Sequence, residues 1–189
     1  MKPKTKAVRK AARAAAPRRA KPAVKITVQK LDANQLHIGK NYPEHGGVFS
    51  GIAKGEGKEP DQAIFRAVGA AAEAIRGPWG PDKNIPAAQS RLDGMANTRA
   101  MAAAGSEIAK KALALKIGKH KDYHIAAARV ARVVAANEED VYDNWRWTST
   151  QLRDYPVYAW VQDFDGGDQL IDLKSDSRAV FLVRSVPIR

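Results

Sequence analysis

The sequence predicts an α+β fold, and three observations lead to it. Short apolar stretches typical of strands occur in both the N-terminal and the C-terminal half, and two stretches with helical spacing lie between them. Late in the chain the sequence DGGD separates two of the apolar stretches, and such turns favour the positive φ angles that hairpins need. Strands, then two helices, then a C-terminal antiparallel β-meander define this fold class.

The first half of the chain contains two predicted strands and one ambiguous stretch. VKITVQKL, residues 24–31, alternates apolar and polar side chains and predicts a strand with one buried face. HGGVFSGIAKGEGKEPD, residues 45–61, predicts a short strand followed by a turn-rich loop. QAIFRAVGAAAEAIRG, residues 62–77, fits either a helix or a buried strand over its first seven residues, and both interpretations stay open.

Two helices are predicted in the middle of the chain. Asn97 or Thr98 can cap the first, which extends to Gly118, and Gly105 with Ser106 allows a break in it. Its apolar stripe is Met101, Ile108, Ala112 and Leu115. The second covers about residues 126–136, with Val130, Val133 and Val134 apolar and Asn137 as its stop. Three strands follow, within VYAWVQDF, QLIDLKS and AVFLVRSVPI.

The net charge of +12 belongs to the N-terminal segment. Residues 1–30 carry 11 of the 32 basic groups and no acid, which leaves 21 basic against 20 acidic groups in the rest. We expect residues 1–23 to be a low-complexity tail that is disordered alone, because its like charges repel and it buries little apolar surface. The expected contacts with nucleic acid or with an assembly partner are Lys4, Lys6, Arg9, Lys10, Arg13, Arg18 and Arg19.

Several function classes are excluded or disfavoured. With no cysteine, the chain has no disulfide, no thiolate zinc site and no cysteine nucleophile. No run of 18 apolar residues exists, so we expect no membrane partner. His120, Asp122 and His124 alternate as metal ligands can, and Asp163, Asp165 and Asp168 surround a turn that superficially resembles a calcium loop. The calcium pattern lacks its distal glutamate, so we expect no metal, no cofactor and no catalysis.

The motifs from residue 45 onward resemble one family. GGVFSGIAKGEGKEPD, RLDGMANTRAMAAAGSEIAKKALALKIGKHKDYHI, NWRWTSTQ, YAWVQDFDGG and VFLVRSVPIR occur in its order. It is the C-terminal domain family of the Legionella collagen-like adhesin Lcl, widespread in prophage tail-fibre and virion proteins and regarded as a variant of the C-type lectin fold. One departure is DYHIAAARVARVV, which lacks the proline and glutamate that the family usually has there.

The resemblance implies a C-type-lectin-like binding domain over residues 45–189, after a strand and linker in residues 24–44. The expected function is that of a non-enzymatic phage or prophage virion protein, a tail or particle-surface component anchored by the basic tail. The expected partners are other virion proteins, further copies in a homo-oligomer, and a host-surface protein or glycan. The alternative is a nucleic-acid-associated protein that acts through its tail. A formylglycine-generating type of enzyme is disfavoured because its usual cysteines are absent.

The aromatic stretch NWRWTSTQLRDYPVYAW holds three of the four tryptophans. The resemblance assigns Trp145, Trp147, Trp160 and Phe164 to recurring positions, and we expect them in the core because large rings supply most of the buried area of a small domain. Their more variable neighbours are the predicted ligand-binding residues, because tyrosine and arginine are frequent contact residues. These form one expected exposed patch: Arg153, Asp154, Tyr155, Tyr158, Gln162 and Asp168.

Overall fold

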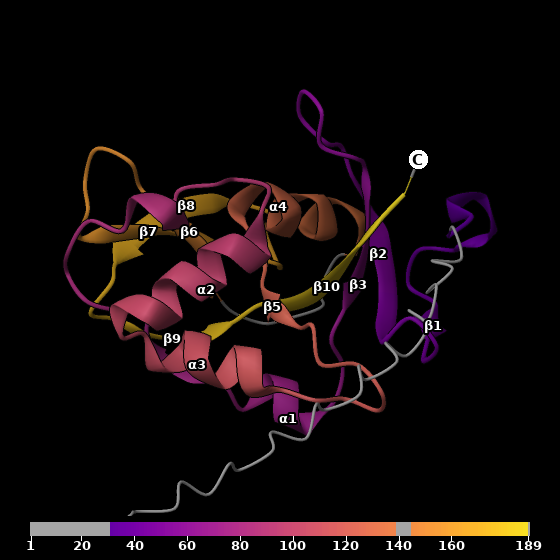
Figure 1. Ribbon diagram of the computed structural model, residues 1–189, viewed down its shortest axis with the longest axis horizontal. Helices are drawn as coiled ribbons and strands as arrows, with labels where there is room; N and C mark the ends of the chain where they lie inside the picture. The colour runs from indigo at the N-terminus through magenta and orange to yellow at the C-terminus, as the bar shows by residue number, and fades with distance from the viewer. Residues whose placement is uncertain (1–30, 139–144, 189) are drawn as a thin grey trace, which may run out of the picture.

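Two five-stranded sheets form the framework of the computed structural model, which describes residues 31–138 and 145–188 (Figure 1). The first sheet has the order β1-β2-β3-β10-β5, and neighbouring strands in it are antiparallel. Its strands are β1 (Asn41–Tyr42), β2 (Gly47–Ala53), β3 (Gln62–Arg66), β5 (His124–Ile125) and β10 (Leu182–Pro187). The sheet therefore joins strands from early and late parts of the chain.

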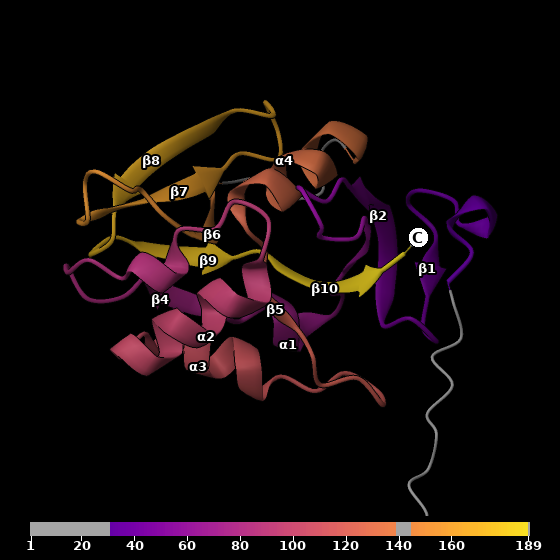
Figure 2. The same ribbon diagram turned by 45° about the horizontal axis from the view of Figure 1, so that its top comes forward.

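The second sheet has the order β4-β9-β6-β7-β8, so β8 is one of its edge strands among the described residues. Its strands are β4 (Arg76–Pro78), β6 (Arg146–Gln151), β7 (Tyr158–Gln162), β8 (Gln169–Leu173) and β9 (Ser177–Val180). β6 and β9 run parallel, while the other neighbours are antiparallel. Figure 2 shows β8 along the outer margin of the molecule, with β7 on its inner side.

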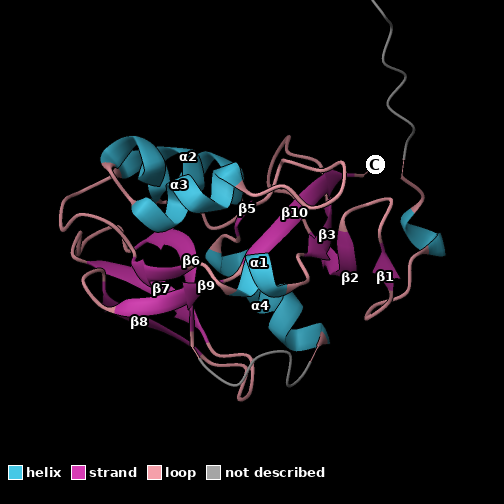
Figure 3. Ribbon diagram, turned by 90° about the horizontal axis from the view of Figure 1, so that it is seen from below, coloured by secondary structure: helices cyan, strands magenta, loops and turns pink. Residues whose placement is uncertain are grey.

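Helices flank the two sheets (Figure 3). They are α1 (Ala70–Glu73), α2 (Gly94–Ala104), α3 (Glu107–Ala114) and α4 (Ala128–Asn137), with short 3₁₀ turns η1 (Ala33–Gln35) and η2 (Pro86–Ala88). Across the described parts of the chain, no helix has the length and apolar character needed to cross a bilayer.

The predicted α+β class is confirmed. The strand expected after His45 is β2, and the loop that follows precedes β3. The ambiguous stretch, residues 62–77, contains both alternatives in succession: β3, then the single turn α1, then β4. The strand predicted at residues 24–31 lies almost wholly outside the described residues.

The first predicted helix breaks at the glycine where a break was expected. Gly105 ends α2 at a φ of 110°, a left-handed conformation that glycine adopts without steric cost. The Ser106 hydroxyl then accepts the Ala109 N–H and caps α3. The predicted N-cap was wrong: Asp93, four residues before Asn97, caps α2 by accepting the Ala96 N–H. Asn97 and Thr98 instead lie inside the helix as buried polar groups.

The terminal strands differ from a simple meander. β7 and β8 form the predicted hairpin, but the third predicted strand divides at Phe181 into β9 and β10, which belong to different sheets. β9 pairs in parallel with β6 rather than with β8. The edge of β8 is therefore left without a neighbouring strand in the described chain. The sequence between β8 and β9 could not show this, because local pairing signals do not record which sheet a strand joins.

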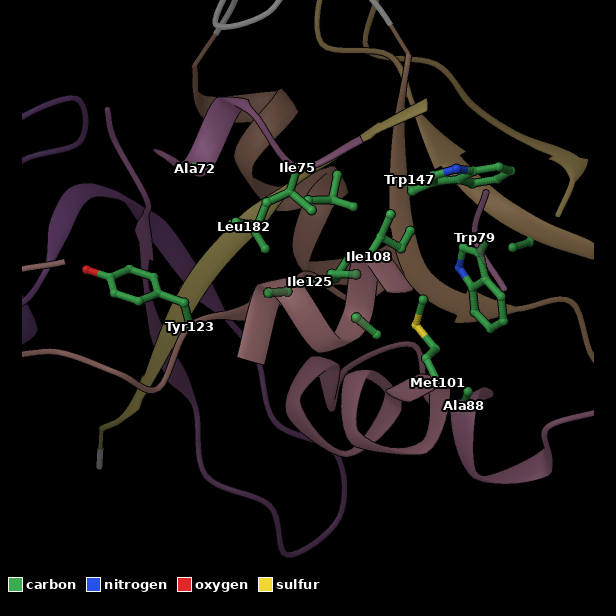
Figure 4. Packing of buried hydrophobic residues seen from close by; sticks show 14 of the residues in the cluster. Ala72, Ile75, Trp79, Ala88, Met101, Ile108, Tyr123, Ile125, Trp147 and Leu182 are labelled. Atoms are coloured by element: carbon green, nitrogen blue, oxygen red, sulfur yellow. The ribbon is translucent and has the colours of Figure 1, made fainter. Parts of the chain in front are cut away.

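Two tryptophans organise the main core. Trp79 and Trp147 are fully buried beside Met101 and Ile108 of the helices α2 and α3 (Figure 4). The indole N–H of Trp79 donates to the Thr148 carbonyl at 2.8 Å, and that of Trp147 donates to the Gly77 carbonyl at 3.1 Å. Each ring therefore buries its area without an unpaired donor. Trp147 and Phe164 confirm the expected core positions, and Trp145 packs at the edge of this cluster.

The sequence TSTQ of β6 is a buried polar network. The hydroxyl of Thr148 donates to the Trp160 carbonyl, and that of Thr150 donates to the Ser90 carbonyl, both at 2.8 Å. Gln151 accepts the Ile85 N–H through its side-chain oxygen. These bonds attach the long segment between β4 and α2 to the sheet. The motif thus has a structural role, since buried polar groups are costly unless they are paired.

Candidate functional site

The β7–β8 hairpin presents an open apolar face. Alternation along β7 sends Ala159 and Val161 into the main core, so Tyr158 and Trp160 lie on the opposite face. Cross-strand pairing places Leu173 opposite Tyr158 and Ile171 opposite Trp160. Four large side chains therefore share one face of the hairpin.

Exposed large apolar side chains concentrate here. Of the seven such residues in the described chain, five lie on β8 or on residues 152–157, the loop before β7. Leu170 is 57% exposed and Tyr155 is 62% exposed. The Lys174 N–H donates to the Val157 carbonyl at 2.9 Å, which holds the loop against the end of β8. We call this area the β7–β8 surface, formed by Tyr155, Val157, Tyr158, Trp160, Ile171 and Leu173.

An arginine lies over the surface. The Arg91 guanidinium is 5.0 Å from the centre of the Trp160 ring, within the range of a cation–π contact. Arg91 also donates to the side-chain oxygen of Gln169, whose amide in turn donates to the Ala128 carbonyl at the start of α4. The segment before α2 and the N-terminus of α4 thus close one end of this face, while Ile171 and Leu173 stay open.

The opposite face of the hairpin is tied down by a buried lysine. Lys174 follows β8 and is fully buried, with its ammonium 4.5 Å from the Trp79 ring centre. It donates to the Lys83 carbonyl at 2.9 Å and to the Gln151 side-chain oxygen at 2.7 Å. Burial lowers the pKa of Lys174 to about 8, partly offset by the nearby Asp82 carboxylate. This lysine fixes the end of β8 to the TSTQ network.

The structure separates the predicted ligand-binding residues into two groups. Arg153, Asp154 and Tyr155 are exposed and Tyr158 is half-buried, all at the Leu173 end of the hairpin. Asp168 is exposed at the other end, beside Gln169. The expectation of one continuous patch is therefore wrong within a single chain. The cause is register: β7 runs between the two groups and separates them by its full length.

Gln162 also differs from its predicted role as a ligand-binding residue. Its side chain is buried, and its amide donates to the backbone carbonyls of Asp163, Gly167 and Asp168 at distances of 2.7–3.1 Å. These bonds close the DGGD turn from within. Gln162 therefore stabilises the hairpin and does not face a ligand.

Trp160 was expected in the core, but it is more exposed than predicted. It is half-buried on the open face, whereas Trp147 is fully enclosed. The sequence also did not identify Ile171 and Leu173 as site residues. Three apolar residues in QLIDL look like a buried strand, and only the sheet order shows that this strand is an edge.

The residues first considered as metal ligands make other contacts. Asp122 pairs with Arg184, which holds the pKa of the carboxyl below its usual value although burial acts to raise it. The ring of His120 contacts the Glu44 carbonyl at 3.0 Å. In the DGGD turn, the Asp163 carboxylate accepts the N–H groups of Asp165 and Gly166. No group of three or more His, Cys, Asp or Glu suited to a metal occurs among residues 31–138 and 145–188.

A contact between Ser185 and His124 was not foreseen. His124 Nε2 lies 3.3 Å from the Ser185 hydroxyl, and Nδ1 lies 3.2 Å from the Asp122 backbone carbonyl, beside a cavity of about 200 Å³. Burial lowers the pKa of His124, so the neutral ring is favoured and both nitrogens can be paired. A backbone carbonyl, not a carboxylate, orients the ring. The residues are 61 positions apart, and no sequence spacing signals the contact.

The tail residues predicted to contact nucleic acid or an assembly partner, from Lys4 to Arg19, lie outside the described residues. Comparison with known proteins adds no relative: no family model, no curated protein and no solved structure matches the chain. The site is therefore defined by its own geometry, in which the β7–β8 surface is the principal open apolar area.

Proposed function

We propose that this protein is a non-enzymatic binding module whose partner docks on the β7–β8 surface. The observation that carries the proposal is the concentration of exposed apolar side chains along β8, which has no second neighbouring strand in the part of the chain that the structure describes. Contiguous apolar patches on soluble domains commonly mark interaction sites, and open strand edges are usually protected by charge or by a covering element. Here Lys174, the lysine that follows the strand, turns into the core.

The composition of the surface favours a protein partner. The surface combines aromatic side chains with one arginine, and both residue types are enriched at protein interfaces. A sheet edge also offers unpaired backbone groups to an added strand. The ordered motifs of residues 45–189 support a more specific proposal, a C-type-lectin-like component of a phage or prophage virion. In it the basic tail anchors the domain to other particle proteins.

Cross-linking in assembled particles tests this function. A photo-reactive amino acid replaces Ile171 in one variant and Ile38 in a control variant, because Ile38 is also exposed, at 50%, but belongs to the N-terminal segment before β1. We expect the chain to purify with the particles and to cross-link at position 171 but not at 38. Absence from the particles would contradict the virion role, and equal or absent cross-linking at 171 would contradict the binding surface.

The concentration of charge in residues 1–30 favours a second candidate, association with nucleic acid through the tail. Duplex DNA binding is measured for the full chain and for a chain that lacks residues 1–23. We expect affinity to fall steeply with salt and to disappear with the tail, because phosphate contacts release counterions. Salt-insensitive binding by the truncated chain would contradict this electrostatic account.

A further inference from the structure

A cavity of about 200 Å³ lies where the start of α2 meets the first sheet. β5 and β10 pair there, and α2 begins against β5 (Figure 2). Gly94 permits this contact, because a Cβ at that position would lie 2.7 Å from the Ile125 carbonyl oxygen. The Thr98 hydroxyl then accepts the Ile125 N–H at 3.1 Å and fixes the helix to the strand. Five lining residues have polar side chains: Gln62, Asp93, Asp122, His124 and Ser185.

The hydrogen bonds of His124 determine which of these groups donate and which accept. Its Nδ1 lies 3.2 Å from the Asp122 backbone carbonyl, which can only accept, so Nδ1 carries the proton. Burial lowers the pKa of His124 and favours the neutral ring, in which Nε2 is then an acceptor. The Ser185 hydroxyl, 3.3 Å from Nε2, therefore donates to the ring. Its proton is committed, and its oxygen keeps lone pairs for the cavity.

The charged side chains that line the cavity are two carboxylates. Asp122 forms an ion pair with Arg184, so its charge is compensated within the chain. Asp93 makes no ion pair among the described residues, and one of its oxygens accepts the Ala96 N–H. The N-terminus of α2 carries a partial charge of roughly +0.5, which is smaller than the full negative charge of the carboxylate. The cavity therefore keeps a net negative character at Asp93.

This combination of acceptors and negative charge selects the chemistry of the ligand. An ammonium group has three N–H donors and no acceptor. Ser185, Asp93 and the side-chain oxygen of Gln62 can accept these donors, because a glutamine amide can present its oxygen to a donor. An anion would instead meet the Asp93 carboxylate, which already occupies the start of the helix as its cap.

The volume and the remaining lining restrict the ligand further. Sites for drug-sized molecules have volumes of roughly 300–1,000 Å³, so a cavity of about 200 Å³ suits a smaller group. Met95 and Pro187 line the same cavity and can cover a short alkyl chain. A metal ion fits less well, since the described residues contain no group of three or more His, Cys, Asp or Glu suited to one.

We propose that this cavity binds a primary ammonium group on a short alkyl chain, with Asp93 as its counter-ion and Ser185 and Gln62 as hydrogen-bond acceptors. His124 is a positioning residue, because it holds the Ser185 hydroxyl with its lone pairs towards the ligand. The site belongs to the first sheet, whereas the β7–β8 surface belongs to the second. The loss of one site therefore leaves the other in place.

The first test titrates the full chain with n-butylamine and follows the NMR signals of the His124 ring and the Gly94 amide. n-Butanol and butyrate are the neutral and anionic probes with the same carbon chain. We expect saturable shifts with butylamine and about tenfold weaker binding of the other two, because they lose a charge-assisted hydrogen bond. No saturable shift with butylamine, or equal binding of all three probes, would overturn the proposal.

The second test removes the counter-ion without removing the helix cap. Asparagine caps helices about as well as aspartate, so Asp93→Asn should keep the start of α2 and lose only the charge. We expect butylamine to bind about tenfold more weakly to this variant. Asp165→Asn, at an exposed carboxylate of the DGGD turn, is the control with the same change in charge and should bind like the unaltered chain. Unchanged binding by Asp93→Asn, or equal losses in both variants, would overturn the proposal.

Ser185→Ala gives an independent result, because it removes an acceptor and leaves the helix cap untouched. Butylamine should again bind several-fold more weakly, and thermal melting checks that the variant is folded. A folded Ser185→Ala variant with full affinity would contradict the role of the hydroxyl.

A third probe identifies the source of the ammonium group. Nα-acetyl-lysine methylamide carries the same butylammonium chain attached to a peptide backbone. Tighter binding of butylamine would assign the cavity to a free amine, and equal or tighter binding of the lysine derivative would assign it to a lysine side chain. Failure of both to bind would overturn the ammonium site and leave the proposed function of the β7–β8 surface unaffected.

Discussion

The two faces of the second sheet differ at the β7–β8 hairpin in which side chains they bury. On the core side, Lys174 and Gln151 are buried and hydrogen-bonded beside Ala159 and Val161. On the other side, Trp160, Ile171 and Leu173 remain partly or largely open. Two polar side chains are therefore enclosed on the core side, while apolar side chains remain open on the other side, where exposed polar residues are more usual. The difference separates residues that hold the fold from residues available to a partner.

The largest expected effect compares two tryptophans. Trp147→Ala should lower the free energy of unfolding by about 3–5 kcal/mol, because it leaves a cavity in a closed core. Trp160→Ala should cost only about 1–2 kcal/mol, because part of that ring is already in water. Chemical denaturation of both variants measures the difference. Equal losses would place both rings in the core and remove the contrast between the two faces.

Gln162→Ala is expected to have the next largest effect. It removes an amide that donates to three carbonyls of the DGGD turn, and we expect a loss of about 1–3 kcal/mol. Asp168→Ala, at the exposed end of the same turn, serves as the control with a smaller loss. Thermal melting of the two variants compares their losses of stability. If Gln162→Ala melts like the unaltered chain, its structural role is wrong and a ligand role becomes open again.

The buried lysine predicts a pH effect of known sign. The pKa of Lys174 falls from 10.5 in the unfolded chain to about 8 in the folded protein. Between these values the unfolded state binds more protons, so stability gains from this group as pH rises from about 8 towards 10. Comparison with Lys174→Met isolates the effect, because the variant lacks the titrating group. The unaltered chain should gain stability relative to the variant over this window, and a relative loss would contradict the sign.

The smallest expected change in stability belongs to Tyr155→Ala. The ring is 62% exposed, so unfolding should change by no more than about 0.5 kcal/mol. Association through the β7–β8 surface should weaken at the same time, because interface tyrosines are frequent hot spots. Melting and sedimentation of the same sample measure both. A folded variant with unchanged association would place the contact elsewhere on the surface.

Much of the fold could be predicted from local sequence. The two helical regions in the middle of the chain, the DGGD hairpin and the strand at GVFSGIA follow from turn chemistry and periodicity, which act over a few residues. The path from β9 to β10 could not be predicted, because the continuous apolar run AVFLVRSVPI shows no break at Phe181. The division between two sheets depends on long-range packing.

The candidate site was predicted only in part. Tyr155 and Tyr158 were identified from residue type, and they lie on the β7–β8 surface. Gln162 was assigned incorrectly, because an amide that closes a turn and one that faces a ligand look alike in sequence. Ile171 and Leu173 were missed for the related reason that an apolar strand gives no local sign of being an edge.

Amide hydrogen exchange along β8 tests the central claim most directly. The outward N–H groups of Gln169 and Ile171 should exchange quickly in the free chain, while those of Leu170 and Asp172 are protected by β7. With a partner bound, the account predicts new protection at Gln169 and Ile171, and in the loop of residues 152–157. Unchanged exchange there, or new protection at the first sheet instead, would contradict the assignment of the β7–β8 surface as the binding site.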